Sequence, residues 1–165
     1  MENFSSMPDH ARTWIYAANK AISEKDKELI LSDLHQFTQS WTAHDQPLKA
    51  EASILYNQFV ILMVDETRNE VGGCGIDNSI QFMKDLGEKY GLDFFNRLLI
   101  HVQNENGIET YTKQSLQDAI DRGLVNPETK VFNNVVHNKS DFLDKWVQSL
   151  ESNWISKQLK FSARV

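Results

Sequence analysis

Six consecutive apolar residues, at positions 59–64, form the longest uninterrupted hydrophobic run of this 165-residue chain. A strand with one face in water alternates apolar and polar residues, whereas a strand that is apolar at every position must be covered on both faces. The run is much too short to cross a membrane as a helix, which needs about 20 apolar residues. It therefore predicts a central strand with other elements packed against both of its faces.

Hydrophobic spacing and turn residues predict further elements before and after this run. The expected strands are 13–18, 50–56, 98–105, 108–112 and 130–136, and the expected helices begin at Ser23, at Asp77 or Ser79, at Thr112 or Ser115, and at Ser140. The first six elements run strand, helix, strand, strand, helix, strand, which is the order of the ferredoxin-like split βαβ fold. In that fold the first and third strands are central, which suits the most apolar strand being the third.

We therefore expect one α+β domain with a mostly antiparallel sheet. Its expected parts are an N-terminal arm (1–12), a ferredoxin-like βαββαβ core (13–105), an extension made of a hairpin strand, a further helix and strand and a C-terminal helix (106–152), and a basic tail (153–165). In this arrangement the strands 13–18 and 59–64 are neighbours.

Composition and charge restrict the partners and the location. A hydrophobic content of 41% with 24% charged residues is typical of a globular chain. The net charge of −6 disfavours nucleic acid, because an acidic surface repels phosphates. The single cysteine, Cys74, excludes an intrachain disulfide, and positions 1–6 carry neither a basic nor an apolar leader. We expect a cytoplasmic protein with a reduced thiol and no membrane association.

The 72–77 loop is the best candidate for a chemical site. Backbone amides of Gly72, Gly73 and Gly75 can turn toward an anion, and the start of a helix favours negative charge, including a thiolate at Cys74. Asp77 would cap the helix. The alternative is purely structural: the glycines make a sharp turn, and Cys74 is a small buried side chain.

A cysteine nucleophile needs a base, usually a histidine. In the ferredoxin-like order His10, His44 and Cys74 fall at one edge of the sheet, with Asp65 nearby and His101 a further candidate. We therefore expect His44 to be the first candidate base. No Walker A order (Gly-x-x-x-x-Gly-Lys-Ser/Thr) and no metal-ligand spacing occurs, so we expect neither ATPase activity nor a cofactor or metal.

The last thirteen residues form a basic segment on an acidic chain. It combines Lys157, Lys160 and Arg164 with interleaved apolar residues at 154, 155, 159 and 161. This pattern is typical of a partner-binding or dimer-forming segment. A tail that folds back on its own domain, or is disordered, has the same composition.

Several segments look like those of a small family of uncharacterised proteins from Bacteroidetes. The matching segments are Thr13-Trp14-Ile15-Tyr16, Gln39-Ser40-Trp41-Thr42-Ala43-His44, the strand 59–64 with Asp65-Glu66, and Gly73-Cys74-Gly75-Ile76-Asp77-Asn78-Ser79. Relatives often carry a transporter-ATPase label, which no phosphate-binding motif in this chain supports. The resemblance implies a bacterial, cytosolic origin and no particular activity.

Two classes of function are consistent with these patterns. The first, which the absence of catalytic motifs favours, is a noncatalytic binding or protein-interaction module, as a monomer or a homodimer. Its partner would be an unknown protein or a small anionic ligand. The alternative is a thiol- or anion-site enzyme built on the 72–77 loop with Cys74.

Overall fold

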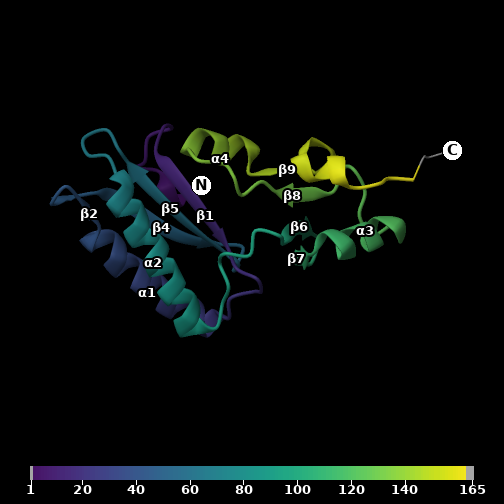
Figure 1. Cartoon of the computed structure of the whole chain (residues 1–165), viewed down its shortest axis with the longest axis horizontal. Helices are drawn as coiled ribbons and strands as arrows, with labels where there is room; N and C mark the ends of the chain where they lie inside the picture. Colours follow the sequence, from purple (N-terminus) through teal and green to yellow (C-terminus); the bar gives the residue numbers. More distant parts are fainter. Residues whose placement is uncertain (1, 163–165) are drawn as a thin grey trace.

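The apolar run lies at the centre of a three-stranded antiparallel sheet with the strand order β1-β5-β4 (Figure 1). The computed structural model describes residues 2–162 and confirms an α+β fold. The strands are β1 (Arg12–Ala17), β2 (Thr42–Ala43), β3 (Gln46–Pro47), β4 (Lys49–Leu55), β5 (Phe59–Asp65), β6 (Ile100–Asn104), β7 (Gly107–Tyr111), β8 (Lys130–Phe132) and β9 (Val147–Ser149). The helices are α1 (Glu24–Ser40), α2 (Gly72–Tyr90), α3 (Lys113–Asp121) and α4 (Lys139–Lys145), with 3-10 turns η1 (Glu2–Phe4), η2 (Leu150–Ser152) and η3 (Trp154–Gln158).

Both faces of β5 are buried, as its sequence predicts. Val60 and Leu62 face the helices α1 and α2. Phe59, Ile61 and Met63 face the opposite way, toward the N-terminal segment, α4 and the end of β8. The expected pairing of the first and third strands is also confirmed, because β1 and β5 are antiparallel neighbours. No helix among residues 2–162 has the length and the apolar content that crossing a membrane requires.

The ferredoxin-like core is not completed, because β6 leaves the first sheet. It lies between β7 and β8 in a separate antiparallel sheet of order β7-β6-β8-β9. One edge of β6 pairs with β7 in a hairpin, and the other edge pairs with β8, where Val102 lies opposite Val131. Val102 also lies in a second core with Leu116 and Leu150, so β6 buries its apolar side there. As a result β1 is an edge strand, where a complete ferredoxin-like sheet would place a neighbour.

Two other local expectations differ from the structure. The hairpin between β6 and β7 turns at Glu105 and Asn106, since Asn104 already pairs with Gly107. We expected the last helix to continue through Leu150, but it ends at Lys145, where the chain returns to the second sheet as β9.

The tail folds back on the second sheet. Ile155 and Leu159 are buried in the second core, and the backbone of Lys160 exchanges two hydrogen bonds with the side chain of Gln117. This is the fold-back alternative for residues 153–162. Arg164, part of the predicted basic tail, lies outside the described residues.

A buried joint connects the two sheets just after β1. The carbonyl oxygen of Ala18 accepts from Nε2 of Gln58 (3.0 Å) and from Nε2 of His101 (3.1 Å). Gln58 also donates to the hydroxyl of Thr110 on β7 (2.8 Å). A carbonyl can only accept, so Nε2 of His101 carries a proton, and the ring is 2% exposed. Burial lowers the pKa of His101, and the bond to Ala18 opposes this shift only partly.

This joint makes the stability of the fold depend on pH. The unfolded chain binds a proton at His101 more readily than the folded chain. The contribution of neutral His101 to the free energy of unfolding is therefore complete above about pH 6.5 and declines as pH falls below that value. We expect His101→Gln, which keeps an N–H donor, to lose less unfolding free energy than the wild type between about pH 7 and about pH 5. Urea unfolding at several pH values measures this difference. His35→Gln, at an exposed position of α1, should behave like the wild type.

Candidate functional site

The predicted 72–77 loop is the first part of α2 and not a loop. The helix begins at Gly72, so Asp77 lies inside it as an exposed residue and does not cap it, contrary to our expectation. No side-chain cap is formed at the N-cap residue Val71, whose own backbone N–H donates to Oε2 of Glu66 (2.8 Å). A carboxylate of the chain itself therefore lies at the helix end that we expected to attract an anionic ligand.

Two of the three glycines have structural reasons to be glycine. Gly72 has a φ of +67°, which favours glycine. At Gly75 a Cβ atom would lie 2.8 Å from Cγ1 of Val71, and the Gly75 carbonyl accepts a 2.9 Å hydrogen bond from Nε1 of Trp41. At Gly73 a Cβ atom would meet nothing within 4 Å. The close packing of α2 against Trp41 thus accounts for Gly75 without a ligand.

The structure brings His44 to the start of α2, as the sheet-edge argument predicts. His44 is exposed in the β2–β3 turn, and a Cβ atom on Gly72 would lie 3.7 Å from its Nε2. Cys74 is also exposed, which excludes the buried-cysteine alternative, but it forms no hydrogen bond with His44 in the described part of the chain. The assignment of these residues to a site stays a prediction.

Two further candidate histidines, His10 and His101, form contacts with other residues. His10 contacts the hydroxyl of Thr67 (3.2 Å), and this hydroxyl donates to Oδ1 of Asp65, so the expected proximity of His10 to Asp65 is correct. His101 lies beyond the other end of β1, in the joint at Ala18. Among residues 2–162 no three His, Cys, Asp or Glu side chains gather as a metal site would require.

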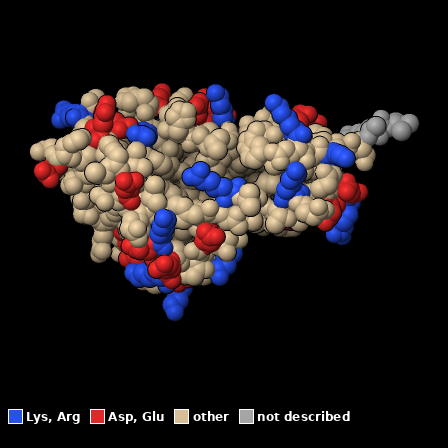
Figure 2. All heavy atoms as spheres, in the orientation of Figure 1, with Lys and Arg blue, Asp and Glu red and all other residues tan. Residues whose placement is uncertain are grey.

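A hollow large enough for a ligand lies elsewhere, along the free edge of β1. It has a volume of about 710 Å³ and separates β1 from the second sheet (Figure 2). We call it the β1 cleft. Its lining comes from four segments, at 12–17, 94–101, 132–137 and 153–155, with Ile80 of α2.

The β1 cleft has basic residues and no acidic ones. Its charged or titratable lining residues are Arg12, Tyr16, Arg97, His101 and His137, and no Asp or Glu occurs in the lining. Arg12 already has partners, since it lies 3.8 Å from Glu66 and over the ring of Trp14. In an acidic chain, this cleft favours an anion.

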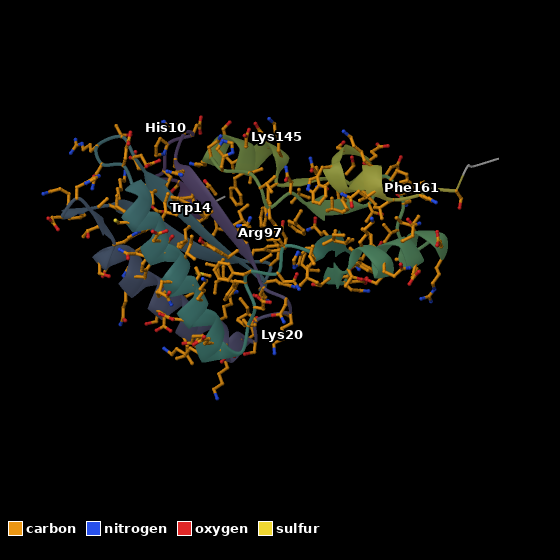
Figure 3. All side chains as sticks on the ribbon, viewed as in Figure 1. His10, Trp14, Lys20, Arg97, Lys145 and Phe161 are labelled. Atoms are coloured by element: carbon orange, nitrogen blue, oxygen red, sulfur yellow. The ribbon has the colours of Figure 1, made fainter. Side chains whose placement is uncertain are left out.

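Arg97 is the second arginine of the lining. It is exposed in the segment between α2 and β6 (Figure 3). Within the described residues no carboxylate lies within 4.0 Å of it. Its charge does reach the phenol of Tyr16: burial raises the pKa of Tyr16, while the Ser79 hydroxyl and Arg97 act in the opposite direction. Arg97 thus lies close to β1 without being neutralised.

The floor of the cleft is the backbone of β1. Thr13 donates its N–H away from β5, to the carbonyl of His137, and Ala18 donates toward the β5 side, to Gln58. Because backbone groups alternate in direction along a strand, Ile15 and Ala17 direct their N–H and C=O groups into the cleft. Within residues 2–162 these groups have no hydrogen-bond partner, and both residues are only half-buried.

Our sequence reasoning missed this cleft, although a signal exists. Each of the three main lining segments belongs to a stretch without any Asp or Glu, at 10–23, 94–104 and 129–140, in a chain that has 23 acidic residues. Spacing along the sequence does not reveal that the three stretches meet, because β6 brings them together only by joining the second sheet.

Comparison with protein-family models, with curated proteins and with solved structures finds no match for this chain. The resemblance to a Bacteroidetes family therefore remains a prediction. The residues that form the β1 cleft and the start of α2 are the basis for any functional proposal.

The structural role of the glycines is testable with one matched pair. Gly73→Ala should raise the unfolding free energy by up to about 1 kcal/mol, because alanine favours a helix and nothing obstructs its Cβ. Gly75→Ala should be less stable than Gly73→Ala by roughly 1–3 kcal/mol, the usual cost of overpacking, because of Val71. Chemical denaturation of both variants measures the difference, and equal stabilities would contradict the packing described here.

Proposed function

We propose that this protein is a noncatalytic binding module whose site is the β1 cleft. Its ligand carries an anionic group, such as a carboxylate, on an apolar body. The observation that carries the proposal is the acid-free lining, with Arg97 unneutralised beside apolar walls. A cytosolic location in a bacterium and a homodimeric state belong to the same proposal and rest on the sequence alone.

The apolar part of the proposal comes from the walls of the cleft. Val135 is 71% exposed and Trp154 is 56% exposed, and both line the cleft. Phe94 and Phe95 line the side toward α2. Exposed aromatic and aliphatic side chains gathered around a hollow are typical of a binding surface, since covering them with a ligand is favourable.

The anionic part comes from Arg97. A guanidinium presents several N–H donors in one plane and binds a carboxylate through two parallel hydrogen bonds. A ligand that fills the cleft also removes water around Arg97, which strengthens this interaction. One free arginine in a chain of net charge −6 does not provide the extended basic surface that nucleic acid requires.

A pair of fluorescent probes tests this proposal. Anilinonaphthalene sulfonate and N-phenyl naphthylamine share an aromatic body, but only the first carries a charge. We expect the sulfonate to bind the folded protein more tightly than the neutral probe, and Arg97→Gln to weaken its binding about tenfold, roughly 1.4 kcal/mol. The neutral probe should bind wild type and variant equally.

The matched control is Arg122→Gln, at an exposed arginine after α3 that does not line the cleft. It changes the net charge by the same amount and should leave the affinity for the sulfonate unchanged. Equal effects of the two substitutions would mean that net charge alone attracts the probe, and the cleft would not be the site.

One observation favours the alternative, an enzyme with Cys74 as nucleophile. Cys74 is exposed in the first turn of α2, and His44 lies beside Gly72 in the same region. Against it, Glu66 places a negative charge at the helix start, which disfavours both a thiolate and a bound anion.

Alkylation of Cys74 with iodoacetamide tests the alternative. If Cys74 is activated, it reacts faster in the folded protein than in the urea-unfolded chain at the same pH, His44→Ala slows the reaction, and Glu66→Gln accelerates it. Equal rates in the folded and unfolded chains, unaffected by His44→Ala, would remove the enzyme hypothesis and leave the binding module.

A further inference from the structure

We infer that the β1 cleft receives the C-terminal segment of a partner protein, which adds to the sheet as a fourth strand beside β1 and places its terminal carboxylate on Arg97. This inference rests on the proposed function and names the class of ligand.

The position beside β1 is the one that a ferredoxin-like sheet fills with its own strand. In that fold the first strand is central, yet here β1 is an edge, because β6 pairs with β7 and β8. Sheet edges are normally covered or protected, since their free backbone groups pair readily with another chain. The free edge of β1 instead forms the floor of an open cleft of about 710 Å³. An added strand completes the sheet by the strand-addition mode of peptide recognition.

The accessible edge is short and closed at both ends. At the start of β1, the N–H of Thr13 donates to the carbonyl of His137 (2.9 Å). After β1, the N–H of Asn19 donates to the carbonyl of Asp93 (3.0 Å). Between these bonds, the groups of Ile15 and Ala17 are free. A guest chain that continued past both ends would have to bend out of the cleft twice. A chain terminus needs to leave at only one end, so the closed ends favour it.

The two sides of the guest strand meet apolar walls. One wall belongs to the core that faces α2 and includes Phe94 and Phe95. The other belongs to the opposite core and includes Phe132 and Val136. Successive side chains of a strand point to opposite faces, so the guest should be apolar at every position, like β5 itself.

A buried, unpartnered atom lies at the same place. His101 lines the cleft and is 2% exposed, and its Nδ1 has no hydrogen-bond partner among the described residues. Because Nε2 donates to Ala18, Nδ1 of the neutral ring carries a lone pair and can only accept. Buried polar atoms normally have a partner, so the described residues leave one polar group beside the cleft unsatisfied.

The terminal carboxylate gives the unneutralised Arg97 its counterion. The lining contains no acidic residue that would repel a carboxylate. An acidic surface of a partner protein is a poorer ligand than a chain end. It would neutralise Arg97 but would leave the apolar walls and the β1 backbone without partners. The charge, the apolar walls and the free edge therefore together favour a chain end over a separate anion.

The test begins with a library of N-acetylated pentapeptides of randomised valine, isoleucine, leucine, phenylalanine and threonine, each with a free C-terminal carboxylate. The library is selected on the purified full chain, and the strongest binder is titrated by calorimetry. Three derivatives of this peptide are then measured: its C-terminal amide, and forms N-methylated at each of two successive backbone amides.

We expect the amide to bind about tenfold more weakly than the acid, and Arg97→Gln to abolish this preference while Arg122→Gln preserves it. N-methylation at one position should weaken binding about tenfold and at the next position should not, since only alternate amides face β1. Ile15→Pro removes the outward N–H of β1 and should weaken binding similarly. If this variant fails to fold, the N-methylated peptides still test whether the guest adds to β1 as a strand.

Each other outcome overturns the inference. No selected peptide, or binding unaffected by N-methylation at both positions, excludes strand addition. Equal binding of acid and amide excludes the chain terminus. Sedimentation that shows a dimer dissociated by Ile15→Pro would assign the edge to a second copy. If no peptide binds but the sulfonate probe does so through Arg97, the binding function stands without the peptide. If neither binds, both fail.

Discussion

The burial of β5 on both faces is the constraint on which the rest of the structure depends. Its residues from Phe59 to Val64 are each 0% exposed. Burying one such side chain contributes roughly 1.5–3 kcal/mol, so a layer on each side of the strand is strongly favoured. The helices α1 and α2 form one layer. The N-terminal segment, α4 and the end of β8 form the other, which is why the chain must return from the second sheet to the first (Figure 1).

That return creates the cleft. The second sheet is held to the first by a buried joint, in which Gln58 and His101 donate to one carbonyl at Ala18. Because the joint lies just after β1 and the chain comes back at His137 near its start, the edge between them is bordered but not covered. An ordinary folding requirement, the covering of β5, therefore leaves a row of backbone groups available beside an unneutralised arginine. The binding function proposed here follows from that geometry.

At the start of α2, residues whose local pattern predicts an anion site have packing roles in the tertiary structure. Glycines before a helix are typical of anion-binding turns. Here the Glu66 side chain accepts from the backbone N–H of Val71 just before the helix, and Trp41 packs against Gly75. Both partners are distant enough that spacing within the segment does not reveal them, yet together they explain most of the pattern without a ligand. The exposed Cys74 is what remains unexplained by packing.

The sequence by itself determined the α+β class, the central strand covered on both faces, and the pairing of the first strand with it, because a doubly apolar run has few ways to avoid water. It also determined the helix start at Ser23, whose side chain accepts from Asp26, since capping is a local interaction. Only the tertiary structure decided which sheet β6 joins, because either pairing would satisfy its backbone, and the second core around Val102 settles the choice. The free edge of β1 and the isolation of Arg97 depend on that decision, which arises from contacts between segments far apart in the chain.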